Sequence, residues 1–373
     1  MKSLKFFVSF TMILIPFASQ GFEWSTFNYL GGVQKAHDYA PSWMADTVSG
    51  YDRVWYCGSA HRANPKKKPG DPSVAGDTIW YSYTIKGQWQ HAKPVEMNPS
   101  EQPWEKRPGE KEIDKRSTCE PIVVRGIFQP PGMGETYSMA MYFIGNNNPV
   151  DGDNHIGVAF SNDGTRWTKY PNNPVIYPMV LSGDYGAGCP NVRNDNGRAG
   201  ITMWYVDVSQ ALNSYPFFNG EFRFMPGPAI GPSLFEVKSN DGVTFSDPKR
   251  LSTRGLAQYI STSCPAISLS PSPPYYLYGL FSEYSSGNEG AKIRMYRILY
   301  NERFSGKWEY LDEIKHSDIN VGAIFEPGFR TDIYGNLSSS FPTIWAGFGC
   351  GSHYARYDHS GSETWDLCNA GGR

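Results

Sequence analysis

The stretch VAFSNDGTRWTKYPNNPVI, residues 158–176, contains two expected strands joined by a tight turn. Apolar and polar residues alternate in its first part, which is typical of a half-buried strand. Asp163 and Gly164 supply the backbone freedom that a tight hairpin requires, and Trp167 follows closely enough to pack back over the turn. A near-copy, VKSNDGVTFSDPKRL, stands at residues 237–251. The two copies indicate a repeated β-hairpin.

A larger repeat becomes visible when the chain is aligned on prolines that begin a short extended run after a loop. Each run is followed by an aromatic, apolar strand, then by a third strand and a turn into a fourth. Four strands per unit, repeated in units of similar length, match the radial geometry of a β-propeller. The prolines that begin the units are Pro41, Pro121, Pro190, Pro265 and Pro327.

The predicted fold is therefore all-β: a five-bladed β-propeller with four-stranded antiparallel blades around a central channel. The composition agrees, because 39 glycines, 28 prolines and 15% aromatic residues favour short strands and tight turns over long helices. Residues 22–373 are expected to form one domain, with FEWSTFNYL at 22–30 supplying the outer strand of the last blade. A β-sandwich or two smaller β domains are the alternatives.

Residues 1–21 have the layout of a secretory signal peptide. Lys2 and Lys5 precede an apolar run at 6–17 that ends in small and polar residues. Removal on export is expected, with an uncleaved anchor as the alternative, and the mature protein is predicted to be secreted or periplasmic. No later segment is apolar for long enough to form a membrane helix, so no integral membrane segment is expected in the mature chain.

The cysteines and the net charge exclude several function classes. Six cysteines in an exported chain can form three disulfides, with fifteen pairings open, and their spacing does not match a structural zinc site. The formal net charge of −2 gives no electrostatic attraction to DNA or RNA, so no nucleic-acid partner is expected. No cofactor is predicted, although a structural cation in the channel stays open.

Carboxylates gather where the first strands begin and the second strands end, which is one face of such a ring. Loops on a rigid scaffold commonly carry function, and a ring of carboxyl groups suits general acid and base chemistry. The alternative is that some of these acids accept hydrogen bonds from inner strands or bind an ion. The candidate catalytic residues are Glu120, Asp38, Glu326, Asp207 and Glu283.

The same face carries long loops at 59–76, 98–118 and 208–232. Exposed aromatic rings in such loops could stack on sugar rings, although each could instead pack against its own loop. Histidines at 37, 61 and 353 also fall there, as channel ligands or as ordinary solvated side chains. The metal ligands are left unknown. The candidate substrate-binding residues are Asp184, Tyr215, Phe218, Trp104 and His353.

The segment YSMAMYFIGNNNPVDGDNHIGVAFSNDGTRWTKYPNNPVI, residues 137–176, resembles the blade pattern of five-bladed β-propeller glycoside hydrolases, which include arabinanases, β-xylosidases, fructosidases and mannoside-acting enzymes. The resemblance implies an acidic base or nucleophile in blade one, a second carboxylate in blade two and an acid further round. Glu120 in CEP matches the blade-two residue. In blade one, Ala40 stands where the family pattern has an acidic residue, and Asp38 is the nearest acid. In blade three, Gly188 stands at the acidic position of the family pattern, and Asp184 and Asp207 are the nearby acids.

Two functions follow as hypotheses. The first is an exported glycoside hydrolase that acts on a poly- or oligosaccharide through carboxylates at the channel mouth. The second is a non-catalytic carbohydrate- or protein-binding propeller, which Ala40 and Gly188 favour. Cys189 and Cys264 stand in the register of Glu120, each directly before a proline, and are expected to be paired or buried rather than nucleophilic.

Overall fold

The computed structural model describes most of the strands of this chain and their turns. Its described residues are 24–29, 38–59, 77–98, 117–146, 154–179, 186–207, 233–257, 264–284, 291–319, 321, 323–351 and 365–372.

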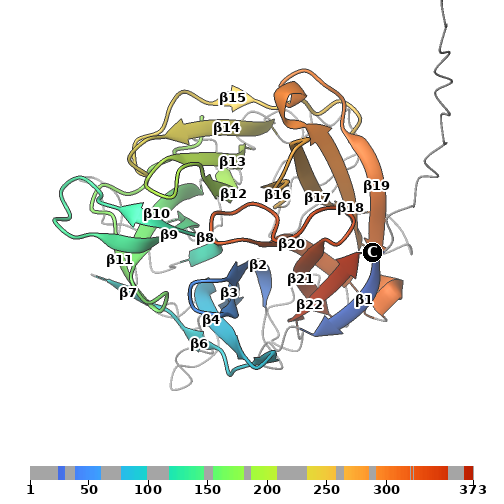
Figure 1. Cartoon of the computed structure of the whole chain (residues 1–373), viewed down its shortest axis with the longest axis horizontal. Coiled ribbons are helices and arrows are strands. Elements are labelled where there is room, and N and C mark those ends of the chain that lie inside the picture. The colour runs from blue at the N-terminus through green and yellow to red at the C-terminus, as the bar shows by residue number, and fades with distance from the viewer. Residues whose placement is uncertain are drawn as a thin grey trace, which may run out of the picture.

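Antiparallel strands form blades of four or five strands around a central axis, which confirms the predicted five-bladed propeller. Blade 1 contains β2 (Tyr39–Asp46), β3 (Tyr51–Ser59), β4 (Asp77–Ile85), β5 (Gln88–Trp89) and β6 (Lys93–Pro94). Blade 2 contains β8 (Ser117–Phe128), β9 (Tyr137–Asn146), β10 (His155–Ser161) and β11 (Arg166–Lys169), with β7 (Glu96–Asn98) added in parallel to β11. Figure 1 shows the first strand of each blade nearest the centre.

The other blades repeat this order from the inside outward. Blade 3 contains β12 (Ala187–Asn194), β13 (Ile201–Asp207), β14 (Ser233–Ser239) and β15 (Lys249–Arg250). Blade 4 contains β16 (Ala266–Leu269), β17 (Tyr276–Tyr284), β18 (Ala291–Leu299) and β19 (Glu309–Lys315), with short 3-10 turns η2 (Tyr300–Glu302) and η3 (His316–Ile319). Blade 5 contains β20 (Ala323–Thr331), β21 (Trp345–Gly351), β22 (Trp365–Gly372) and β1 (Trp24–Tyr29).

The ring closes through β1, the first strand of the described chain. It pairs antiparallel with β22, the last strand, as predicted for the segment at 22–30. The inner strands β2 and β20 also pair in parallel, with Trp43 opposite Arg330 and Met44 opposite Thr331. Because β20 pairs with β2, the inner edge of blade 5 is not left unpaired where it meets blade 1.

The two copies of the SNDG turn fasten neighbouring blades to each other. Gly164 and Gly242 both have positive φ, +84° and +79°, as the turn requires. The carbonyl of Gly164 accepts hydrogen bonds from the indole nitrogens of Trp55 in blade 1 and of Trp167, at 2.8 and 3.0 Å. The carbonyl of Gly242 accepts the hydroxyl of Tyr142 in blade 2, at 2.8 Å. Each turn therefore ties its own blade to the preceding one.

Each turn is also fixed from within by an aspartate. The Asp163 carboxylate accepts the amides of Thr165 and Arg166, both at 2.8 Å, and the Asp241 carboxylate likewise accepts the amides two and three residues after it. Burial opposes ionisation of Asp163, but these hydrogen bonds outweigh it and lower the pKa of the carboxyl well below its ordinary value.

The core consists of aromatic and aliphatic side chains between blades. The rings of Trp55 and Trp167 meet edge to face at 6.3 Å across the boundary of blades 1 and 2. Trp204 and Trp308 are fully buried in blades 3 and 4. Within the described residues no helix reaches the length and apolar character needed to cross a bilayer.

Candidate functional site

The inner strands share an unusual backbone conformation at one position. The residue directly before each of the five prolines has a positive φ, which is rare for residues other than glycine. In four of the five inner strands the pairing register shifts at this point, which marks a β-bulge. The five residues are Ala40 (φ 48°), Glu120 (48°), Cys189 (52°), Cys264 (25°) and Glu326 (46°).

These bulges surround a cavity at the centre of the ring. It encloses about 500 Å³, including space open to solvent, and all five prolines line it. Ala40, Glu120, Cys189 and Cys264 line it as well. The recurring backbone strain thus presents one residue from each of blades 1 to 4 to this cavity, and such strain is found at functional sites.

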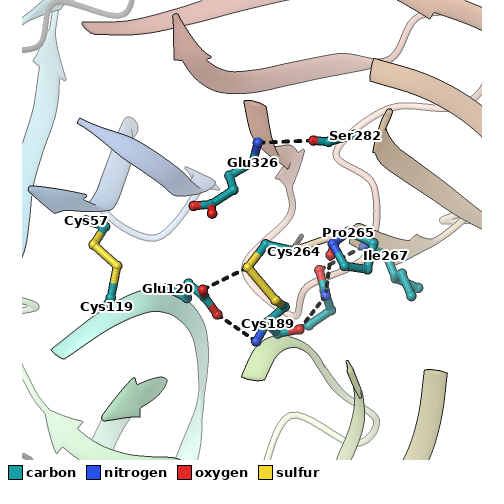
Figure 2. Close-up of a disulfide and its surroundings, with 10 residues drawn as sticks. Cys57, Cys119, Glu120, Cys189, Cys264, Pro265, Ile267, Ser282 and Glu326 are labelled. Atoms are coloured by element: carbon teal, nitrogen blue, oxygen red, sulfur yellow. Dashed lines mark hydrogen bonds between the residues drawn. A yellow bond between two sulfur atoms is a disulfide. The ribbon is translucent and has the colours of Figure 1, made fainter. Parts of the chain in front are cut away.

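Glu120, from β8, is buried and held by two neighbours from blades 3 and 4. Its Oε2 accepts a hydrogen bond from the backbone amide of Cys189 at 2.7 Å. Its Oε1 lies 2.8 Å from the Sγ of Cys264 (Figure 2). Because a hydrogen bond from a backbone amide favours the charged form of a carboxyl group, this arrangement suits an ionised Glu120.

Glu326, from β20, has a different environment. Its amide donates to the hydroxyl of Ser282 at 3.2 Å, and Figure 2 shows its carboxyl group extending toward the part of the view that contains Glu120 and Cys119. The Oε2 atom is buried and has no hydrogen-bond partner within the part of the chain that the structure describes, although the residue as a whole keeps partial exposure. Burial, and then the charges of Glu120 and Asp77, raise the pKa of Glu326 well above its ordinary value.

The two glutamates therefore differ in their hydrogen bonding, and the pKa of Glu326 is raised. Neighbouring like charges cannot both ionise easily in a buried site, so the proton stays on the group with the poorer hydrogen bonding. That group is Glu326, since Glu120 has the amide of Cys189. Such a pair can donate a proton to one atom of a ligand and accept a proton from another.

Asp77 is a member of this cluster that the sequence analysis did not select. It begins β4, the third strand of blade 1, and its Oδ2 accepts the hydroxyl of Tyr39 at 2.7 Å. Its charge is one cause of the raised pKa of Glu326. The first and third strands of a blade begin on the same face of the propeller. An acid at the start of a predicted third strand, such as Asp77, could therefore have been selected from the sequence.

Asp38 is fully buried at the entrance to β2. A Cβ atom on Gly58 would lie 3.0 Å from Oδ1 of Asp38 and 2.7 Å from Cδ1 of Trp80. The Asp38 carboxyl group is thus packed against the second and third strands of blade 1 and depends on a glycine at 58. Ala40, two residues further on, is the blade 1 residue that lines the cavity.

The carboxyl groups of Asp207 and Glu283 each have a partner outside the Glu120–Glu326 cluster. Asp207, at the end of β13, is buried and accepts the amide of Met179 at 2.8 Å. Glu283, near the end of β17, pairs with Arg294 at 2.8 Å on the adjacent strand. Side chains alternate along a strand, so Glu283 points away from the side on which its neighbour Ser282 contacts Glu326.

All six cysteines are paired, as expected, and the structure assigns the pairing. The disulfides are Cys57–Cys119, Cys189–Cys264 and Cys350–Cys368. Two groups of potential metal ligands lie close together in the described residues, one around Asp77 and one around Glu120, but each contains two cysteines joined in a disulfide. Disulfide sulfurs are not thiolates, so neither group offers the ligands that zinc prefers.

All five predicted substrate-binding residues lie outside the described residues. These are Asp184, Tyr215, Phe218, Trp104 and His353, together with His37, His61 and most of the loops at 59–76, 98–118 and 208–232.

Comparison with known proteins identifies the fold. No family model and no curated protein sequence matches the chain. An α-L-arabinofuranosidase from Podospora anserina in complex with cellotriose matches with a TM-score of 0.57 at 11% identity, over 95% of this chain and 97% of that chain. The catalytic domain of a family 62 α-L-arabinofuranosidase from Coprinopsis cinerea gives 0.56 at 13%, over 94% and 97%. A family 62 hydrolase in complex with xylotriose gives 0.52 at 12%, over 90% and 91%.

The chain thus shares the five-bladed propeller fold of these glycoside hydrolases along nearly its whole length. The resemblance inferred from residues 137–176 is confirmed at the level of the fold. At these identities the likeness does not extend to the activity.

Proposed function

We propose that this protein hydrolyses glycosidic bonds in a poly- or oligosaccharide at the mouth of the central channel. The observation that carries the proposal is the convergence of Glu120 and Glu326, from equivalent positions in blades 2 and 5, on one buried cluster. Two carboxyl groups in unlike environments are the general requirement for glycoside hydrolysis. The shared fold with arabinofuranosidases supports the same class of substrate.

In this mechanism Glu326 is the general acid. Its neutral carboxyl group donates a proton to the glycosidic oxygen as the bond from that oxygen to the anomeric carbon breaks. Glu120 is the carboxylate partner: it accepts a proton from water as the water oxygen bonds to the anomeric carbon. Asp77 acts through Glu326, because its negative charge disfavours a second charge and keeps the acid protonated.

The other predicted acids are proposed in lesser roles. Asp38 is proposed to position the start of β2 in blade 1, where its carboxyl group packs beside Trp80 and Gly58. Asp207 orders the segment at Met179 on the channel face. Glu283, paired with Arg294, is proposed to stabilise blade 4. The residues outside the described ranges, including Tyr215 and Phe218, stay proposals for sugar stacking.

The experiment is a panel of polysaccharides and aryl glycosides, with arabinofuranosides first because the Podospora and Coprinopsis proteins are arabinofuranosidases. Reducing-sugar release and product profiles are compared among wild type, Glu120→Gln and Glu309→Gln. Glu309 is a matched control, since its side chain is 57% exposed and pairs with Arg297 on blade 4. Turnover lost only in Glu120→Gln supports the proposal; equal turnover in all three proteins removes Glu120 from the mechanism.

A second candidate function is a carbohydrate-binding propeller without catalysis. This function is favoured by the residues before the prolines in blades 1, 3 and 4, none of which is acidic. Ala40 stands in blade 1, and Cys189 and Cys264 of blades 3 and 4 form a disulfide. Both oxygens of Glu120 are also already in contact with protein atoms. No turnover by wild type on any substrate, together with glycan binding in the micromolar to millimolar range, would establish this function instead.

We further propose that residues 1–21 are a signal peptide removed on export and that 22–373 form a single domain. Three disulfides indicate folding in an oxidising environment, which supports a secreted or periplasmic protein. Mass spectrometry of the mature N-terminus tests the cleavage site.

A further inference from the structure

Two of the three disulfides bracket Glu120. Cys119, the residue before it, is bonded to Cys57 on β3 and so fixes the backbone of β8 to blade 1. The Cys189–Cys264 disulfide joins blades 3 and 4 and contacts the carboxyl end of the same residue (Figure 2). Glu120 is therefore held at its backbone by one disulfide and at its carboxyl group by another.

The contact with Cys189 and Cys264 fixes both carboxyl oxygens. The amide of Cys189 donates to Oε2 at 2.7 Å, and the Sγ of Cys264 lies 2.8 Å from Oε1. A disulfide sulfur carries no hydrogen, so the second contact is a close approach of oxygen to sulfur, and the amide is the hydrogen-bond donor. The terminal torsion of a glutamate is otherwise broad and roughly two-fold. With both oxygens in contact, that torsion is restricted to one orientation.

Cys189 and Cys264 are held in place by the surrounding strands as well. The side-chain amide of Asn191 donates to the carbonyls of Cys189 and Pro265 at 3.0 and 2.8 Å, and its oxygen accepts the amide of Ile267 at 2.8 Å. Blades 3 and 4 are thus joined by hydrogen bonds beside the disulfide. Opening the disulfide frees the Cys264 side chain to rotate away from Oε1 of Glu120, while the Cys189 amide and the hydrogen bonds of Asn191 stay in place.

We propose that the Cys189–Cys264 disulfide is a positioning element of the site, which orients the Glu120 carboxylate, and that its reduction by a thiol lowers activity reversibly. This inference rests on the proposed hydrolysis and deepens it. The reaction balances as thiol–disulfide exchange: a dithiol reductant transfers two electrons and two protons to the cystine, giving two cysteine thiols and an oxidised, cyclic reductant. Both cysteines line the central cavity.

The first test removes the disulfide by substitution. Cys189→Ala with Cys264→Ala is compared with Cys350→Ala with Cys368→Ala, a matched control that lacks the disulfide between β21 and β22 of blade 5. The channel variant should lose kcat by about ten- to a hundred-fold with little change in KM, because a misplaced catalytic group has this effect. The control should keep its kcat. Equal loss in both variants contradicts the proposal.

A double-mutant cycle separates positioning from general stabilisation. If the disulfide acts through Glu120, removing it in a Glu120→Gln background causes no further loss of kcat, since the two changes affect one interaction. A purely structural disulfide gives losses that multiply. An aryl glycoside with a good leaving group is used as the substrate, so that the Glu120→Gln variants still give a measurable rate.

A second measurement covers the case in which the alanine variants fail to fold. Folded wild-type protein is treated with increasing dithiol, the opened cysteines are identified by differential alkylation and mass spectrometry, and activity is followed in parallel. Loss of activity should follow the opening of Cys189–Cys264 and reverse on reoxidation. Full activity with this disulfide open contradicts the proposal.

A third measurement requires no turnover and so distinguishes failure of this inference from failure of the proposed function. Carboxyl titrations are followed by NMR in protein labelled at the glutamate side-chain carbon. Because the charge of Glu120 is one cause of the raised pKa of Glu326, the Glu326 titration should move in the channel variant and stay unchanged in the Cys350/Cys368 control. An unmoved titration with the disulfide absent overturns the inference, whether or not the wild type hydrolyses any substrate.

Discussion

Glu120 and Glu326 occupy the same position in blades 2 and 5: each precedes a proline, each has a φ near +47°, and the charge of the first raises the pKa of the second. Their difference lies in their neighbours. Glu120 receives the Cys189 amide, whereas Oε2 of Glu326 is buried with no hydrogen-bond partner in the described part of the chain. A repeated backbone feature therefore provides two carboxyl groups, and the surrounding contacts place them in different environments.

Replacing Asp77 should shift the pH dependence of activity. Burial, Glu120 and Asp77 raise the pKa of Glu326, so Asp77→Asn removes one of three causes and lowers that pKa. In the proposed mechanism Glu326 acts when protonated, so activity should fall as the pH rises through its pKa. The alkaline limb of the kcat/KM profile should therefore move to lower pH in Asp77→Asn and stay in place in Glu309→Gln. If the alkaline limb of the Asp77→Asn profile does not move, Asp77 does not influence the pKa of the general acid.

Glu326 should also make stability depend on pH. Its pKa is raised in the folded protein, so its contribution is fully present below the unfolded value of about 4.3 and is lost as the pH rises through the folded value. Glu326→Gln, which cannot ionise, should gain stability relative to wild type as the pH rises from the unfolded pKa to the folded pKa of Glu326, and the difference should be constant above the folded pKa. Urea unfolding between pH 4 and 9 measures this difference; a constant difference across the range contradicts it.

Asp241 should behave in the opposite sense. Burial raises the pKa of its carboxyl group, but the amides of Thr244 and Val243 outweigh it and hold the pKa below the ordinary value. Its contribution is present above the unfolded pKa of about 3.9 and is lost as the pH falls through the folded value. Asp241→Asn should thus be less stable than wild type at pH 7, with the gap narrowing below pH 4. Exposed Asp247 provides the control substitution, and a gap that persists in acid counts against this role.

Gly328 should be essential for closing the ring between blades 5 and 1. A Cβ atom there would overlap the carbonyl oxygen of Pro41, so the inner strands would have to separate. Gly328→Ala should destabilise the fold by about 3 kcal/mol or more. Gly132→Ala is the matched control: its φ is +81° with no atom within 4 Å of the added Cβ, so it should lose only about 1 kcal/mol from backbone strain. Similar losses of stability in Gly328→Ala and Gly132→Ala would contradict the close approach of Gly328 to Pro41.

The fold could be predicted because its signals are local and repeated. The SNDG turns at 161–164 and 239–242 and the prolines that begin the inner strands are visible in the sequence. The role of the turns as fasteners between blades could not be predicted. It depends on Trp55 and Tyr142 in the preceding blades, which approach the turns only when the ring is formed.

The candidate site was predictable only in part. Glu120 and Glu326 share a position before proline, so the repeat itself brings them to one level of the channel. Asp77 begins a third strand and was missed because only first strands and the ends of second strands were considered. The Glu283 side chain could not be oriented without the strand register, which directs it to Arg294. The disulfide pairing could not be chosen from fifteen alternatives without distances.

The most direct test of the central claim compares two leaving groups in Glu326→Gln. A general acid is needed to protonate a sugar leaving group and is hardly needed for a nitrophenyl group that leaves readily. The variant should lose about 10² to 10⁴ in kcat/KM on the oligosaccharide but stay within about tenfold of wild type on the nitrophenyl glycoside. Equal losses on both substrates, or no loss on either, would contradict the assignment of Glu326 as the acid.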